Sequence, residues 1–383
     1  MGTQKPVIAI IVMLLAISSA YIFSDDIFDP DQVPSAPMEL MAAAGIGTVF
    51  LDWESPESDG GSPIQEYRVY VSNVSESVLA TGRLIGITLQ TQFNCVNLTP
   101  GLTHYFLVTA VNEKGEGAIA QITAVPIDAS GNLTVYFIDV GQGDSILIQT
   151  PDGKNILIDS GSDSAYSALD SFLQSKSITV IDVVVATHPD EDHIGGLDDV
   201  LLDYDVLSVY DSGFYKDTQI YERFRNYTDT EGCPYYNDTN IDPGILNWSS
   251  EVFFYLLHID ADAADANDAS IVLKMSFGEV DFLLTGDAEE HVESWMLPLY
   301  DLDVEILKVG HHGSRTSSSL PFLTEVTPSV AIISVGEDNR YEHPHNETID
   351  KLTDIGADIY RTDLNRTITI TTDGTGWDIL CWG

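Results

Sequence analysis

The feature that most constrains the fold is an apolar, β-branched run that ends in a cluster of histidines and aspartates. Residues 180–186 read Val-Ile-Asp-Val-Val-Val-Ala, a composition typical of a buried strand. His188, Asp190, Asp192 and His193 follow it with the spacing H-x-D-x-D-H, and a Gly-Gly pair comes next. In α/β proteins, sites are built from loops at the carboxyl ends of strands. The pattern therefore predicts an α/β sheet with a polar site at one edge.

The side chains in this cluster are those that bind divalent metal ions. Imidazole nitrogens and carboxylate oxygens together suit Zn²⁺, Mn²⁺ or Mg²⁺. The alternative is a solvated acidic loop in an acidic protein. Two further clusters, at residues 310–313 (Gly-His-His-Gly) and 343–345 (His-Pro-His), also follow strand-like runs. Six of the nine histidines lie in these three clusters, which favours a shared site over scattered core histidines.

The charge of the chain limits its partners and setting. It has 383 residues, enough for two or three domains, with 60 acidic residues against 16 basic ones and a net charge of −44. The acidic residues are spread along the chain, as on a solvated surface. This balance suits a saline or extracellular setting. It argues against a broad nucleic-acid surface, because DNA phosphates would be repelled.

Two features predict export. Residues 7–23 are apolar and follow a single basic residue, Lys5, so they form either a cleavable signal peptide or a membrane anchor helix. N-glycosylation sequons are also more frequent than the roughly two expected by chance. Eight of the 14 asparagines lie in such sequons: Asn73, Asn97, Asn132, Asn226, Asn237, Asn247, Asn346 and Asn365. We expect a glycoprotein that is secreted or anchored to the outer face of the cell membrane.

The pattern of hydrophobic residues along the chain divides it into three parts. Residues 1–30 hold the signal or anchor and a linker. Residues 33–128 show short strand patterns at the spacing of a β-sandwich. Residues 132–383 alternate between strand and helix patterns. Within the last part, residues 210–266 are aromatic and irregular, and we expect them to form a long loop or small subdomain over the site.

Residues 33–128 resemble a fibronectin type III domain. The matching features include Trp53, the Gly-Gly-Ser-Pro turn at residues 60–63, the Leu-Thr-Pro-Gly stretch at residues 98–101, and Tyr105. The resemblance implies an all-β sandwich in which Trp53 fills the core and Tyr105 makes the tyrosine corner. Such domains space or bind other molecules, so we expect this one to contact cell-surface material.

Residues 132–383 resemble metallo-β-lactamase superfamily hydrolases of the ComEC competence-protein type. The motifs, which span this region in order, are residues 137–144 (FIDVGQGD), 158–161 (IDSG), 188–193 (HPDEDH), 267–270 (NDAS), 285–287 (TGD), 308–314 (KVGHHGS) and 343–345 (HPH). The resemblance implies an αββα fold with a metal site at one edge of its two sheets. The whole chain is therefore expected to be multidomain, with an all-β sandwich followed by this fold.

The resemblance also implies two divalent ions, Zn, Mn or Mg. Their ligands would be His188, Asp190, Asp192, His193, Asp287 and His311. Asp287 would bridge the ions. We rank His311 above His312, although spacing alone does not separate them. Asp159 and Asp144 would support the ligands through hydrogen bonds, and a turn-capping role is the alternative for Asp159.

Two departures from the commoner superfamily pattern weaken the first metal site. Asp190 replaces the middle histidine of H-x-H-x-D-H. The usual third histidine is missing, and Asn267 and Ser270 occupy that neighbourhood. With fewer nitrogen ligands, the first site should bind more weakly or prefer Mn or Mg, which makes a two-zinc lactamase activity doubtful.

The expected reaction is attack on a phosphodiester by a metal-activated water. The catalytic residues would be Asp192, with His312 or His343 protonating the leaving oxygen. The substrate-binding residues would be Lys308, Ser314, Arg315, Asn339 and Tyr341. For the basic residues, surface ion pairing is the alternative.

We therefore expect an exported metal-dependent phosphodiesterase or nuclease whose partner is a phosphodiester, including DNA. One alternative is a metal-dependent hydrolase of an ester, lactone or lactam. Another is a cell-surface binding protein with a vestigial hydrolase domain.

Overall fold

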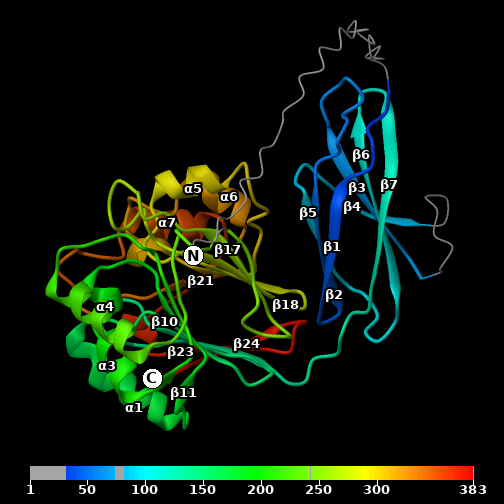
Figure 1. Ribbon diagram of the computed structural model, residues 1–383. Helices are drawn as coiled ribbons and strands as arrows, with labels where there is room; N and C mark the ends of the chain where they lie inside the picture. Colours follow the sequence, from blue (N-terminus) through cyan, green and yellow to red (C-terminus); the bar gives the residue numbers. More distant parts are fainter. Residues whose placement is uncertain (1–31, 74–81, 242, 383) are drawn as a thin grey trace, which may run out of the picture.

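The computed structural model describes residues 32–73, 82–241 and 243–382. The expected signal or anchor at residues 7–23 lies outside this part of the chain. Among the described residues, no helix combines the length and the apolar character needed to span a bilayer. Figure 1 shows a slender all-β body beside a larger body of sheets and helices.

The first body is a sandwich of two antiparallel sheets. One sheet has the order β1 (Met38–Gly45), β2 (Thr48–Glu54), β5 (Gln92–Cys95), and the other has the order β4 (Arg83–Thr88), β3 (Glu66–Ser72), β6 (His104–Asn112), β7 (Gly115–Ala124). Trp53 is 3% exposed and meets Tyr67 edge-on within the core between the sheets. The sandwich and its core tryptophan are thus as expected from the sequence.

The expected tyrosine corner is wrong by one residue. Tyr105 is only partly buried, whereas His104 is 3% exposed. His104 Nε2 lies 3.3 Å from the carbonyl oxygen of Thr99, a few residues upstream. The histidine therefore takes the position of the corner residue, because it faces the core while its neighbour on the strand faces outward.

The second body contains two larger sheets packed face to face. The first has the order β15 (Tyr235–Tyr236), β14 (Val209–Asp211), β12 (Val183–Ala186), β10 (Asn155–Ile158), β9 (Ile146–Gln149), β8 (Leu133–Phe137), β23 (Ile368–Thr372), β24 (Trp377–Cys381). The second has the order β16 (Gly244–Leu246), β17 (Phe253–His258), β18 (Val272–Phe277), β19 (Val280–Leu284), β20 (Ile306–Lys308), β21 (Val330–Ile333), β22 (Asp358–Arg361). Buried Phe137, Phe254 and Phe282 belong to the core that the sheets share.

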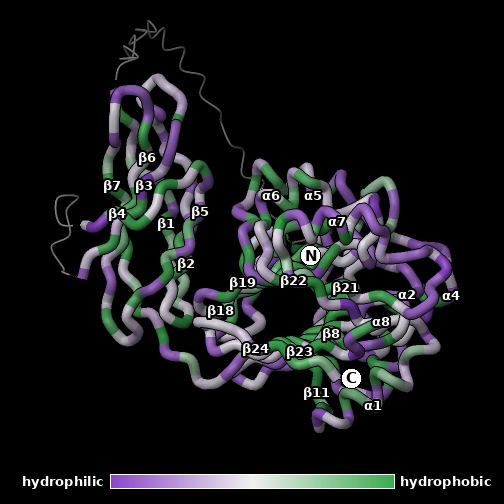
Figure 2. The backbone as a smooth tube through the Cα atoms, turned by 180° about the vertical axis from the view of Figure 1, so that it is seen from behind, coloured by the Kyte–Doolittle hydropathy of each residue, from purple (hydrophilic) through white to green (hydrophobic). Residues whose placement is uncertain are grey.

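Helices cover the outer face of each sheet. The first sheet is covered by α1 (Tyr166–Ser175), α3 (Leu197–Asp203) and α4 (Gln219–Glu231), and the second by α5 (Glu290–Met296), α6 (Leu320–Val326) and α7 (Asn346–Asp354). The short segments are η1 (Asp163–Ala165), α2 (Glu191–Ile194), η2 (Gly310–Gly313) and α8 (Thr362–Asn365). Figure 2 shows hydrophobic stretches along inner strands such as β8, β21 and β23. The αββα architecture expected for residues 132–383 is therefore present.

The apolar run at residues 180–186 forms two strands instead of one. β11 (Val180–Ile181) pairs with β13 (Asp205–Val206), and β12 joins the first sheet. Asp182 interrupts the run, because its carboxylate accepts hydrogen bonds from Lys154 Nζ and the Asn155 backbone N–H. The four residues of β12 are all buried, since the sheet is covered on both faces.

Residues 210–266 are more regular than expected. They supply α4, the edge strand β15, and strands β16 and β17 of the second sheet. The prediction of a loop or subdomain over the site is therefore wrong for most of this segment. Its aromatic residues serve the core instead: Trp248 meets Phe254 at a centroid distance of 5.0 Å.

The two bodies pack against each other beside β17. Phe50 of the sandwich is 7% exposed, and its ring centroid lies 4.9 Å from that of Tyr255. A side chain at Gly45 would collide with Phe253, because its Cβ would lie 2.3 Å from that ring. Beyond β7, the Ser130 N–H donates to Glu251 Oε2 at 2.8 Å. The sandwich is thus fixed to the second sheet by packing as well as by the linker.

Candidate metal centre

Three strand ends meet at the metal centre. The loop after β12 carries His188 and leads into α2, β19 leads to Asp287, and β20 leads into η2 with His312. Because β19 and β20 run parallel, their carboxyl ends lie at the same sheet edge. Residues more than a hundred positions apart therefore converge between the two sheets.

The centre of this group is formed by Asp192, His193, Asp287 and His312. His193 Nε2 lies 3.3 Å from both His312 Nε2 and Asp287 Oδ1. His312 Nε2 lies 3.5 Å from Asp192 Oδ2 and 3.4 Å from Asp287 Oδ2. Ligand atoms bound about 2.0–2.1 Å from one tetrahedral ion are separated by about 3.3–3.4 Å. Asp192, His193 and His312 thus lie close enough to bind one cation, and His188, His193 and Asp287 lie close enough to bind another.

His188 and Asp190 are arranged differently. His188 is fully buried, its Nε2 has no hydrogen-bond partner, and it lies 3.9 Å from Asp287 Oδ2. An orphaned buried nitrogen beside a carboxylate fits a second cation, because a buried polar atom without a partner is otherwise unfavourable. Asp190 does not join the group. It forms an ion pair with Lys216 Nζ at 2.6 Å.

The protonation of the group reflects its buried charges. Burial opposes ionisation of Asp287, but the neighbouring His312 and His193 outweigh this and hold its pKa well below the usual value. Burial likewise disfavours the charged form of His193 and His312, yet Asp287 and other carboxylates raise the pKa of both rings well above normal. Burial and the charge of His193 lower the pKa of His188 to about 3. A metal ion would therefore replace protons on His193 and His312.

Asp159 positions the loop as the sequence led us to expect. Its Oδ2 accepts hydrogen bonds from His193 Nδ1 and Thr187 Oγ1, both at 2.7 Å, and its Oδ1 accepts from the Thr187 N–H. The bond to Nδ1 leaves His193 Nε2 facing the centre. Asp159 also has a left-handed backbone, with φ 57°, a strained conformation that such a network can stabilise.

The conformation of η2 decides which of its two histidines reaches the centre. His311, His312 and Gly313 have consecutive positive φ values of 47°, 53° and 79°. The turn buries His312 to 2% exposure, and its Nδ1 donates to the Ser334 carbonyl oxygen at 2.9 Å. His311 instead contacts Glu289 at 3.0 Å and lies 3.9 Å from Asp287. The geometry therefore reverses our ranking and favours His312 as the ligand.

Lys308 and Asp144 form a buried ion pair beside the centre. Lys308 is fully buried, contacts Asp144 Oδ2 and donates to the Gly286 carbonyl oxygen at 2.9 Å. Asp144 Oδ1 lies 3.5 Å from His312 Nδ1, which agrees with the supporting role expected for it. Burial opposes ionisation of Asp144, but Lys308 outweighs this and lowers its pKa. The substrate-binding role expected for Lys308 is a poor fit, because its ammonium is enclosed.

The other expected substrate-binding residues divide into buried and exposed ones. Ser314 is 3% exposed. Asn339 holds its own loop together, because its amide donates to the carbonyl oxygens of Gly336 and His343. Arg315 is exposed, and Tyr341 is 44% exposed. Only the last two are thus placed to meet a substrate.

Two basic residues lie near the centre: Lys216, which had no sequence signal, and Arg340, which precedes the motif at residues 343–345. Lys216 pairs with Asp190 from 26 positions away and belongs to no motif. Arg340 stacks on Tyr341, with its guanidinium carbon 4.7 Å from the ring centroid, and its charge interacts with Asp192. Ser270, expected near the missing histidine, accepts from the Asp287 N–H at 3.1 Å and lies 3.4 Å from His188 Nδ1.

Comparisons with known proteins agree with this fold and site. A model of the metallo-beta-lactamase superfamily matches residues 138–337, and a model of the fibronectin type III domain matches residues 35–126. Both resemblances seen in the sequence are confirmed.

The chain is also similar to three bacterial proteins. ComE operon protein 3 of Bacillus subtilis is 33% identical over 257 residues, which are 61% of this chain and 32% of that protein. Competence protein ComA of Neisseria gonorrhoeae is 30% identical over 246 residues, 63% of this chain and 32% of that protein. Recombination protein 2 of Haemophilus influenzae is 31% identical over 220 residues, 56% of this chain and 26% of that protein. The chain thus spans a third or less of each relative.

Replacing His312 should impair metal binding far more than replacing its neighbour. We expect His312→Ala to weaken Zn²⁺ or Mn²⁺ binding by at least roughly 100-fold, because a direct ligand is lost, whereas His311→Ala should change it by less than about threefold. Titration calorimetry of the full chain would measure both affinities. Equal losses in the two variants would contradict this assignment.

Replacing Asp287 should reduce the amount of bound metal more than replacing Asp190 does. After dialysis against metal, we expect Asp287→Asn to retain almost no metal, because this carboxylate lies near His188 on one side and near His193 and His312 on the other. Asp190→Asn should keep the ion held by Asp192, His193 and His312. Metal content measured by mass spectrometry, with circular dichroism as a check on folding, would compare them. The same retained amount in both variants would argue against a shared role for Asp287.

Proposed function

Because the chain belongs to the metallo-beta-lactamase superfamily and has the fold of a metal-dependent hydrolase, we propose that it hydrolyses phosphodiesters in DNA or nucleotides. The observation that carries the proposal is the group of Asp192, His193, Asp287 and His312, in which neighbouring nitrogen and oxygen atoms lie 3.3–3.5 Å apart. The relatives are named as a ComE operon protein, a competence protein and a recombination protein. These names point to nucleic acid as the substrate class.

Two divalent ions would be held by this group and by His188. When bound, such ions lower the pKa of a water molecule and stabilise charge on the attacked phosphorus. No cysteine lies in the group, and the ligands are oxygens and imidazole nitrogens, which suit Zn²⁺ or Mn²⁺. His188 Nε2 has no hydrogen-bond partner, and the Asp190 carboxylate is paired with Lys216. The ion beside His188 should therefore bind more weakly than the ion beside Asp192, His193 and His312.

Asp192 and His312 would have different roles toward the attacking water and the leaving group. Asp192 has a side chain that is 27% exposed, while His193, Asp287 and His312 are nearly enclosed. It is thus the ligand that can also hydrogen-bond an incoming water. Both ring nitrogens of His312 are engaged, so it is not the proton donor to the leaving group.

His343 is the better placed of the two histidines proposed to assist the leaving oxygen. Its ring centroid lies 5.3 Å from that of His311, and its Nδ1 is buried without a partner. Burial and the charge of His311 lower the pKa of His343 to about 4. It is therefore neutral at pH 7, which does not suit the proton-donor role expected from the sequence, but its ring N–H can donate a hydrogen bond to a phosphate oxygen.

The rim of the centre carries cations and aromatic rings. Lys216 and Arg340, two of only 16 basic residues, contact or face the metal loop of this acidic chain. Beside them lie Tyr215, which is 67% exposed, and Tyr341, which is 44% exposed. Cations suit phosphate groups, and exposed rings beside them suit stacked bases. A neutral ester would use neither feature.

The activity can be tested with the full chain and a small diester. We expect turnover of bis-p-nitrophenyl phosphate and single-stranded DNA with Mn²⁺, loss of turnover with a chelator, and at least a roughly 1000-fold lower kcat in Asp192→Ala. His311→Ala, which keeps the four-residue group, is the matched control. Initial rates at pH 7 give the comparison.

Other outcomes would point elsewhere. Turnover of an ester, lactone or lactam panel without phosphodiester turnover would favour the second hydrolase class. A full chain that retains no metal after purification with Zn²⁺ or Mn²⁺ would favour a binding protein with a vestigial hydrolase domain.

We also propose that the protein is exported and glycosylated. Of the eight sequon asparagines, six are exposed, and Asn237 and Asn365 are partly buried, so a glycosyltransferase could reach most of them on the folded surface. Cell fractionation with peptide mass spectrometry would test this. Protein found inside the cell, with unmodified sequons and an intact residue 7–23 segment outside any membrane, would contradict the proposal.

A further inference from the structure

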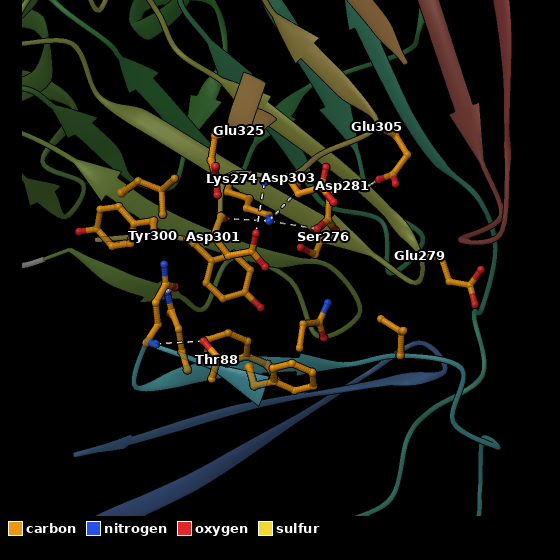
Figure 3. Close-up of a pocket in the computed structure, with 18 of the residues that line it drawn as sticks. Thr88, Lys274, Ser276, Glu279, Asp281, Tyr300, Asp301, Asp303, Glu305 and Glu325 are labelled. Carbon is orange, nitrogen blue, oxygen red and sulfur yellow. Dashed lines mark hydrogen bonds and ion pairs between the residues drawn. The ribbon is translucent and has the colours of Figure 1, made fainter. Parts of the chain in front are cut away.

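A cleft of about 700 Å³ separates the sandwich from the second sheet, and none of the metal-centre residues lines it. Figure 3 shows acidic side chains on the sheet side and Thr88 on the sandwich side. The sheet side carries six carboxylates and one lysine: Glu279, Asp281, Asp301, Asp303, Glu305, Glu325 and Lys274. A cavity of this volume suits a small organic molecule.

The acidic wall is built by strand alternation. Tyr255 pairs with Lys274, and Ser276 pairs with Asp281, so these side chains share the outer face of β17, β18 and β19. The lysine does not neutralise the wall. Its Nζ is 3.3 Å from Asp281 Oδ2 and donates to the carbonyl oxygens of Asp301 and Asp303 at 3.1 and 2.9 Å. Most of the carboxylates therefore face the cleft without a cation.

Buried oxygens without partners line both walls. The Tyr255 hydroxyl belongs to a side chain that is 7% exposed, and it has no hydrogen-bond partner. The same is true of Asp281 Oδ1 on the sheet and Asn94 Oδ1 on β5 of the sandwich. Asn94 lies directly across from Phe50, which packs against the Tyr255 ring. The three residues all line the cleft and come from two domains, so a ligand in the cleft would lie beside unpartnered oxygens of both.

The distribution of the oxygens favours an extended cation over a metal ion. A metal site needs at least three ligand atoms close together. Among the described residues, none of these acids belongs to such a cluster. The charges are thus spread along the wall. Apolar Phe50, Ile87 and Leu257 also line the cleft, where they can contact methylene chains.

We propose that this cleft binds a linear polyamine, an unbranched alkylamine with two or more ammonium groups. Its N–H groups donate to Asp281, Tyr255 and Asn94 and lie among the carboxylates that have no basic partner, and its methylenes pack on the apolar residues. Because both domains supply acceptors, the ligand also holds the sandwich to the second sheet. The proposal is independent of the hydrolytic activity.

Titration calorimetry of the full chain with spermidine tests the proposal. We expect saturable one-to-one binding that Tyr255→Phe and Asn94→Ala each weaken by about 3- to 10-fold, because each variant removes one acceptor. Tyr255→Phe keeps the ring that packs on Phe50. Glu57→Gln, which removes an exposed charge outside the cleft, is the matched control and should change the affinity by less than about twofold.

Several results would overturn it. Equal binding by all variants and the control would show only general attraction of cations to an acidic protein. Tighter, variant-sensitive binding of Ca²⁺ or Mg²⁺ would make the cleft a metal site, and tighter, variant-sensitive binding of a lysine-rich peptide would make it a protein-docking site. Thermal unfolding of each variant checks the fold, and Asn94→Ala tests the opposite wall if Tyr255→Phe proves unstable.

Discussion

The structure depends on placing several charged groups in one enclosed site. Asp144, Asp159 and Asp287 are buried within a few ångströms of His193 and His312. Unpaired charges of this kind are strongly unfavourable away from water. Here each carboxylate has a partner of its own: Lys308 for Asp144, Thr187 for Asp159, and the rings of His193 and His312 for Asp287. The two sheets supply these partners because their strand ends meet at the same edge.

The parts of the site that lie close together in sequence were predictable. The six-residue span from His188 to His193 carries its own spacing, and the apolar run before it indicates the strand that presents it. Asp287 and the paired histidines were found through motifs at later strand ends. The choice between His311 and His312 was not predictable, because it depends on three left-handed residues in succession, and spacing does not report φ.

The predictions that were wrong share a physical cause: each depended on tertiary contacts that the sequence does not show. Lys308 ends an apolar strand, and its sequence position does not show that Asp144 encloses it. Residues 210–266 lack strong periodicity, yet β15, β16 and β17 pair with strands from other parts of the chain. In the sandwich, adjacent His104 and Tyr105 both fit a corner by composition, and the pleat alone decides which faces inward. The contact of Phe50 with Tyr255 had no sequence signal at all.

The ion pair between Lys216 and Asp190 has a consequence for metal affinity at the centre. A cation that used Asp190 as a ligand would first have to displace the Lys216 ammonium, which lies 2.6 Å from Oδ1. Both side chains are partly exposed, so dissolved salt would screen their attraction. The charge of one lysine outside every motif would thus determine how readily that position fills.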